Sequence, residues 1–205
     1  SPHGRYVLLS QETTGGISGS YVNRIAFLKD GNGTAIKPFE GTADFRFSPD
    51  DRYLLVRPRR ILGDDKAHSA RVTLYESASG RQVFSLPEPV SSLSQIIFSS
   101  DSKHLAVVQA DYITFWSLES LQPEFYVLTD ERSDNVAMIL PSGYYLYTGN
   151  PSVLQKLALV QNGKARSLRQ FDLYLNRPDT VIAAINRILF GRISLQTRHE
   201  IELVN

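Results

Sequence analysis

Residues 45–56 read Phe-Arg-Phe-Ser-Pro-Asp-Asp-Arg-Tyr-Leu-Leu-Val, which is the pattern of a strand, a tight turn and a second strand. Phe45 and Phe47 alternate with Arg46, as expected for a strand with one buried face. In the turn, proline presets the backbone φ angle, and the serine and aspartate side chains bond nearby backbone N–H groups. The apolar run after the turn then predicts a second strand that pairs with the first.

This pattern recurs along the chain. Related stretches begin at Ser1 and Ser99, and a weaker copy begins at Leu140, so the four turns start 47, 51 and 41 residues apart. A four-stranded blade of a β-propeller has a repeat length of about 40–45 residues. The sequence therefore predicts an all-β protein with about four propeller blades.

The end of the chain has a different pattern. Asn176-Arg177-Pro178-Asp179 predicts a helix start, because proline is tolerated in the first turn and aspartate is favoured near the positive end of the helix dipole. Apolar residues follow at helical spacing, namely Val181, Ile182, Ile185, Ile188 and Leu189. We predict propeller blades over residues 1–170 and a helix-containing extension over residues 171–205.

Two hypotheses describe how the blades are completed. In one, this chain is the C-terminal part of a larger propeller. In the other, four blades close into a small ring, and residues 201–205 return a strand beside the first repeat so that no sheet edge stays open.

Composition limits the class of protein. A net charge of +1 argues against a global attraction to nucleic acid or to an anionic membrane. The absence of cysteine excludes disulfides and thiolate chemistry. The sequence also has no run of about 18 apolar residues, which is the length a membrane-spanning helix needs. We expect a cytoplasmic protein without a nucleic-acid partner.

Catalytic and metal-binding patterns are not evident in the sequence. The four histidines are not at metal-ligand spacing, and the glycine-rich residues 15–20 lack the second glycine of a nucleophile elbow. We therefore predict a protein that is not an enzyme and has no cofactor or metal. The alternative is a propeller hydrolase that places carboxylates at its central channel, for which the candidates are Asp44, Asp111 and Asp134.

Two groups of residues are candidates for binding a protein partner. The first is a basic cluster, because arginine side chains bind carboxylates and phosphates in a bidentate manner. The second is a pair of tyrosines in the fourth repeat. The residues are Arg57, Arg59, Arg60, Lys66, Tyr144 and Tyr145. Each group also has a structural alternative. The basic residues could form a solvated loop that Asp64 and Asp65 neutralise, and the tyrosines could belong to the hydrophobic core. A subunit that stacks against neighbouring protomers is a third functional hypothesis.

Parts of the chain resemble a known family. The repeat resembles the blade of a WD-repeat β-propeller. Its order is a strand, the turn Ser-Pro-Asp-Asp, a second strand and a later strand that ends in Trp116, although Ser117 stands where that family has aspartate.

The tail resembles a more particular group. Pro141-Ser142-Gly143-Tyr144-Tyr145 and residues 171–179 are similar to the end of the WD-repeat region in bacterial proteins that also carry a caspase-like peptidase. This resemblance implies a sensing or regulatory scaffold in a peptidase system. The peptidase would lie on another segment or another chain, since this chain has no cysteine.

Overall fold

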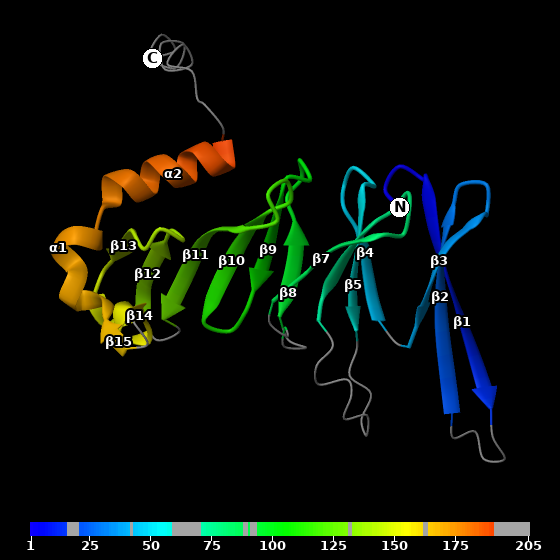
Figure 1. Ribbon diagram of the computed structural model, residues 1–205, viewed down its shortest axis with the longest axis horizontal. Coiled ribbons are helices and arrows are strands. Elements are labelled where there is room, and N and C mark those ends of the chain that lie inside the picture. The colour runs from blue at the N-terminus through cyan, green and yellow to red at the C-terminus, as the bar shows by residue number, and fades with distance from the viewer. Residues whose placement is uncertain are drawn as a thin grey trace, which may run out of the picture. The chain divides into compact units, whose positions relative to one another are not determined.

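The computed structural model describes residues 1–15, 21–41, 43–58, 71–87, 90, 94–130, 133–161 and 164–190. The chain divides into two compact units, residues 1–105 and 106–205. Antiparallel strands make up most of the described part, and one helix of more than two turns follows them (Figure 1). The predicted all-β fold class with a C-terminal helix is therefore confirmed.

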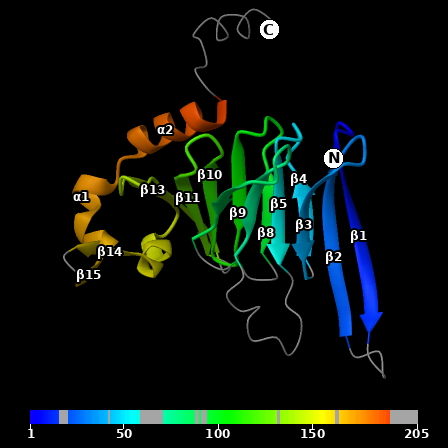
Figure 2. The same ribbon diagram turned by 45° about the vertical axis from the view of Figure 1, so that its right-hand side comes forward.

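The first sheet has three antiparallel strands in the order β1-β2-β3 (Figure 2), formed by β1 (Tyr6–Gly15), β2 (Tyr21–Asp30) and β3 (Ala35–Glu40). The polar sequence after Ser10 predicts a loop over residues 11–20, and for residues 11–15 this expectation was wrong. Each residue of β1 pairs with one of β2, from Tyr6 with Asp30 to Gly15 with Tyr21. Backbone pairing therefore extends the strand irrespective of its side-chain polarity.

The sequence Asp30-Gly31-Asn32-Gly33 predicts a hairpin turn, and the structure forms this turn between β2 and β3. The Asp30 carboxylate accepts hydrogen bonds from the backbone nitrogens of Asn32 (3.0 Å) and Thr34 (2.8 Å). Gly33 has a φ of 86°, in the left-handed region that glycine adopts without steric cost. The Asp-Gly-Asn-Gly sequence thus specifies the turn through both its carboxylate and its glycine.

The second sheet is a four-stranded antiparallel meander, which is the form of a propeller blade. Its strands are β4 (Ala43–Phe47), β5 (Tyr53–Pro58), β6 (Thr73–Glu76) and β7 (Gln82–Ser85). Apolar residues from the first two sheets pack into one core, whose buried members are Ala26, Leu28, Phe39, Leu54 and Val56.

Six further strands follow in the sheet order β13-β12-β11-β10-β9-β8. They are β8 (Gln95–Phe98), β9 (His104–Val108), β10 (Tyr112–Ser117), β11 (Pro123–Asp130), β12 (Ser133–Ile139) and β13 (Tyr145–Thr148). The third and fourth repeats do not form separate sheets, because β12 pairs directly with β11. Only residues 131 and 132 separate these two strands, which is the length of a hairpin connection.

Short helical elements and one hairpin complete the second unit. The sequence around residues 153–168 predicts a hairpin, and β14 (Ala158–Gln161) and β15 (Lys164–Ser167) form it. The helical elements are the 3-10 helices η2 (Pro151–Lys156) and η3 (Leu168–Phe171), α1 (Asp172–Leu175) and α2 (Pro178–Phe190).

Helix α2 is held against the sheet by its apolar face. Val181 and Ile185 are buried against Phe125, Leu140 and Leu146. The predicted helix is thus confirmed, whereas the predicted domain boundary near residue 170 stays a prediction. The predicted strand at residues 201–205 lies outside the described residues.

The contact at Gly80 yields a stability prediction. Gly80 has a φ of 66°, and a Cβ atom there would lie 2.8 Å from the Cβ of Lys37. Gly33 has a similar backbone, but a Cβ there would have no neighbour within 4 Å. We expect Gly33→Ala to cost about 1–2 kcal/mol through backbone strain alone and Gly80→Ala to cost more. Urea denaturation checks this, and equal losses would contradict the importance of the contact with Lys37.

Candidate functional site

The four repeat turns share a closing backbone hydrogen bond and a left-handed residue at the fourth position. In the second and third turns, the first residue donates its N–H to the carbonyl of the sixth, at 2.9 Å for Ser48 to Tyr53 and 3.0 Å for Ser99 to His104. The fourth residue donates its N–H back to the carbonyl of the first in all four turns. That fourth residue has a positive φ in every case: 71° at Gly4, 64° at Asp51, 58° at Ser102 and 90° at Gly143.

Serine side chains hold the second and third turns from within. The Ser48 hydroxyl donates to Oδ1 of Asp50 at 2.6 Å and accepts the Tyr53 N–H at 2.9 Å. The same two bonds, at 2.6 and 2.9 Å, join Ser99 to Asp101 and to the N–H of His104. Serine at the first position and aspartate at the third therefore specify this turn together.

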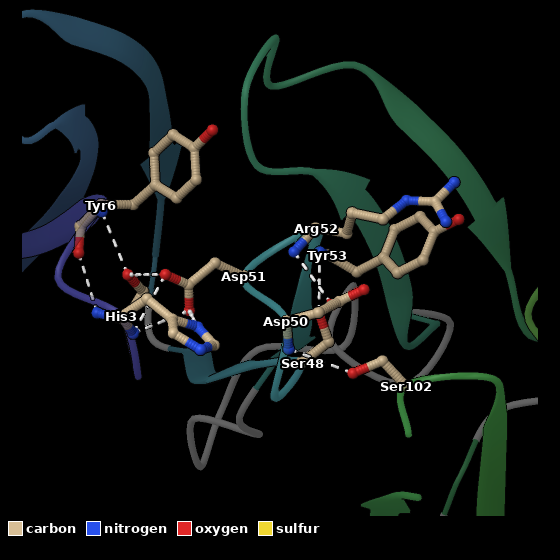
Figure 3. Close-up of polar contacts among 9 residues, drawn as sticks. His3, Tyr6, Ser48, Asp50, Asp51, Arg52, Tyr53 and Ser102 are labelled. Carbon is tan, nitrogen blue, oxygen red and sulfur yellow. Dashed lines mark hydrogen bonds and ion pairs between the residues drawn. The ribbon is translucent and has the colours of Figure 1, made fainter. Parts of the chain in front are cut away.

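Side chains also connect consecutive turns (Figure 3). The Asp51 carboxylate accepts hydrogen bonds from the Ser1 hydroxyl at 2.8 Å and from the His3 N–H at 3.1 Å. Likewise, the Ser102 hydroxyl accepts the N–H of Asp50 at 3.1 Å. In both cases, the residue in the left-handed position bonds the third residue of the preceding turn. We call the first three turns and these bonds the turn network.

The Asp51 carboxylate is the buried charge of the turn network. Its side chain has no exposed surface, and the Nδ1 atom of His3 lies 3.7 Å from it. Burial raises the pKa of Asp51. The hydrogen bonds from Ser1 and His3 and the positive charge that His3 can carry lower it by a larger amount, so the pKa lies below its ordinary value. The arrangement therefore stabilises an ionised aspartate between two turns.

Two arginines bind backbone carbonyls within and just before β8, which is the terminal strand of its sheet. The Nη1 atom of Arg46 donates to the carbonyl of Ile96 at 2.9 Å, and that of Arg57 donates to the carbonyl of Ser94 at 2.8 Å. These bonds occupy edge carbonyls that could otherwise pair with another strand. Arg57 thus has a structural role, while the other predicted basic residues, Arg59, Arg60 and Lys66, lie outside the described residues.

The two predicted tyrosines have different surroundings from those expected of a contact surface. Tyr145 is fully buried, and its hydroxyl donates to Oδ1 of Asp172 at 2.6 Å. The Tyr145 carbonyl also accepts the N–H of Arg177 at 2.9 Å. Tyr144 is half-buried and packs against the core cluster that contains Val181. The two residues therefore fix the start of the helical segment, which consists of α1 and α2, on the sheet.

Five large apolar side chains are exposed on this helical segment. Leu173 and Tyr174 of α1 are 93% and 75% exposed, and Phe190 at the end of α2 is 66% exposed. Ile182 and Leu189 are seven residues apart and so lie on the same side of α2. We call these five residues the helical patch. Sequence spacing alone did not identify it, because Ile182 and Leu189 fit the same apolar pattern as the buried Val181 and Ile185.

The carboxylates of the hydrolase hypothesis lie on different elements. Asp44 is on β4 opposite Arg57, Asp111 precedes β10, and Asp134 is on β12. Among the described residues, no three His, Cys, Asp or Glu side chains gather as a metal site would require. Within that same part of the chain, no helix combines the length and apolar character needed to cross a membrane.

Comparison with known proteins concerns the fold alone. No protein-family model matches the sequence, and neither does any curated protein. One similar solved structure is the β-propeller domain of the Trilobed protease from Pyrococcus furiosus, with 10% identity over 70% of this chain and 49% of that chain, and a TM-score of 0.43.

Two further solved structures are similar at the same level. The eukaryotic initiation factor has 17% identity over 75% of this chain and 40% of that chain, with a TM-score of 0.45. The dihydro-heme d1 dehydrogenase NirN in complex with DHE has 13% identity over 81% of this chain and 35% of that chain, with a TM-score of 0.41. This chain therefore spans less than half the length of each of these three structures.

Asp51 provides a pH-dependent prediction. In Asp51→Asn, one acceptor oxygen is replaced by a donor group that faces the donors of Ser1 and His3. We expect the variant to lose about 1–3 kcal/mol of unfolding free energy at pH 7. Because folding lowers the pKa of Asp51, the stabilisation is present above the ordinary aspartate pKa and is lost as the pH falls through the folded pKa.

The measurement is urea denaturation at pH 7 and at a series of values below about pH 4. The difference between the wild type and Asp51→Asn should shrink as the pH falls. Glu119→Gln is the control, because it removes a carboxylate at an exposed position outside the turn network. A pH-independent difference for Asp51→Asn would contradict the role of its charge.

The Tyr145–Asp172 hydrogen bond provides a second prediction. Tyr145→Phe removes the donor to a carboxylate, and bonds of this kind contribute about 1.5–3 kcal/mol. We expect faster hydrogen exchange over residues 172–176 and lower overall stability. Tyr147→Phe on the same strand is the control. Unchanged exchange in Tyr145→Phe would show that the helical segment is held by its apolar face alone.

Proposed function

We propose that the chain is a non-enzymatic protein-interaction scaffold, and that the helical patch is where it binds a protein partner. The observation that supports this most directly is the exposure of the five apolar side chains on a short segment that is itself anchored to the sheet. Ile182 and Leu189 lie on the same side of α2, and exposed apolar groups that share a surface mark interaction sites more often than scattered ones do.

The anchoring of the segment strengthens the proposal. The Tyr145–Asp172 hydrogen bond, the Arg177 N–H bond to the Tyr145 carbonyl and the burial of Val181 and Ile185 all fix it on the sheet. A segment that is already ordered loses less conformational freedom on binding, so more of the apolar contact contributes to affinity. Aromatic anchors such as Tyr174 and Phe190 are common among the residues that dominate binding energy.

The finer proposal is that the partner belongs to a caspase-like peptidase system, which this chain would regulate. The support for it is the sequence resemblance of residues 141–145 and 171–179, and these same residues hold the helical segment in place. The peptidase would lie on a further segment of the protein or on another chain. Its active site would require the cysteine that this chain lacks.

Charged substitutions in the patch test the proposal. We expect Ile182→Glu and Leu189→Glu to reduce capture of the partner by the immobilised protein at least tenfold, because each places a charge in an apolar contact. Proteins captured from the source cell would be compared by quantitative mass spectrometry, and the fraction would be assayed for peptidase activity. The unfolding midpoint of each variant is measured as well, because Ile182 is 52% and Leu189 43% exposed and part of each side chain is buried.

The matched control is Gln155→Glu, which adds the same charge at an exposed polar position of η2. It should capture the same proteins as the wild type. If the patch variants also captured the same set, the helical patch would not be the binding surface. If the purified chain hydrolysed a substrate by itself, the scaffold proposal would be wrong.

A further inference from the structure

The hairpin β14–β15 forms a sheet of its own beside the larger sheet of the second unit. Among the described residues, β15 pairs with β14 alone, and all four of its side chains are exposed. Both views place the hairpin at the margin of this unit (Figure 1, Figure 2). Because β15 has one neighbouring strand, half of its backbone N–H and C=O groups point away from β14, along an outer edge.

The two ends of the hairpin hold this edge in place. Leu154 precedes β14, Leu168 follows β15, and both are buried in the same core cluster. Between these anchors, Val160 is 69% exposed. A two-stranded hairpin that buries so little is marginal in stability and gains from a third strand. An edge that is already extended also loses less conformational freedom when a strand is added to it.

The segment that contains the hairpin carries charge of one sign. Residues 135–171 include four basic residues and no acidic residue, whereas the rest of the chain has 18 basic and 21 acidic residues. Within the described part of the chain, no ion pair involves Lys164 or Arg166 of β15. The small net charge of the whole chain therefore conceals a local excess of positive charge, which attracts an anionic partner over about 10 Å.

The spacing of the two basic residues of β15 matches that of a paired strand. Lys164 and Arg166 are two residues apart, so both side chains project from the same face and lie about 7 Å apart along the strand. Carboxylates at alternate positions of an added strand have the same spacing and would lie opposite both cations. Opposite charges at such cross-strand positions stabilise the pairing, and an arginine can bind a carboxylate through two parallel hydrogen bonds.

We infer that the outer edge of β15 binds an extended peptide of a protein partner, which adds a third strand and carries acidic residues at alternate positions. Backbone hydrogen bonds supply affinity in strand addition of this kind, and side chains supply specificity. A lysine on an edge strand opposes the addition of neutral or basic strands, whereas an acidic strand is attracted by it. This surface differs from the helical patch, so the inference does not rest on the proposed function.

Binding of synthetic peptides to the purified chain tests the inference. The probe is a short, fluorescently labelled peptide in which glutamate alternates with valine or threonine. The matched control peptide has the same composition, but its glutamates are consecutive and so point to opposite faces of a strand. We expect fluorescence anisotropy at low salt to show at least tenfold tighter binding of the alternating peptide. Hydrogen exchange should slow at the amides of β15 that point away from β14.

Charge reversal in the chain provides a second arm of the experiment. Lys164→Glu combined with Arg166→Glu should weaken binding of the alternating glutamate peptide at least tenfold, because like charges then lie opposite each other. The same variant should bind a peptide in which lysine replaces each glutamate, and this binding also shows that its edge is intact. The matched control is Lys103→Glu combined with Arg187→Glu, which changes the net charge equally at exposed positions on other elements.

Four results would overturn the inference. The first is equal affinity for the two glutamate peptides, or no binding of either, because β15 would then not accept a strand in this register. The second is equal weakening in the Lys103 and Arg187 control, which would assign the effect to net charge. The third is a reversed variant that does not bind the lysine peptide. The fourth is tighter binding of a single-stranded oligonucleotide of equal charge, lost in the reversed variant, which would make nucleic acid the occupant.

Discussion

The bond between the side chain in the left-handed turn position and the preceding turn is the constraint on which the first unit depends. Each sheet closes its own backbone bonds, and the apolar part of the packing between sheets is not directional. Asp51 and Ser102 remove this freedom, because each bonds a specific backbone N–H of the neighbouring turn. Since the Asp51 carboxylate is buried and ionised, leaving it without its donors would cost more than the bonds themselves contribute.

The repeat could be predicted from sequence because its signals are local. Ser48-Pro49-Asp50-Asp51 specifies a turn through proline geometry and side-chain bonds that span five residues, and alternation specifies the flanking strands. The helix was predictable for the same reason, from Pro178 and the spacing of Val181 and Ile185. The strand β1 was cut short in the prediction because its polar end pairs with β2, and pairing between segments is not a local property.

The site predictions depended on information that the sequence does not hold. Tyr145 and Tyr147 alternate on one strand, and the sequence does not show which of the two faces is buried. The structure buries Tyr145 and bonds it to Asp172, 27 residues further along the chain. Similarly, Arg57 was assigned to a loop by its charged neighbours, but it lies on β5 and bonds the backbone carbonyl of Ser94. Long-range partners of this kind decide whether a polar residue is structural or available.

The treatment of apolar faces differs between the two units. In the second unit, helix α2 covers apolar residues of the sheet, including Phe125 and Leu146. In the first unit, no described residue covers Val7 and Leu9 in this way. Repeat architectures need a polar or covered surface where the array ends, because each repeat buries its faces only against neighbours. The described residues thus leave Val7 and Leu9 partly exposed in the first unit, whereas in the second unit α2 covers the sheet.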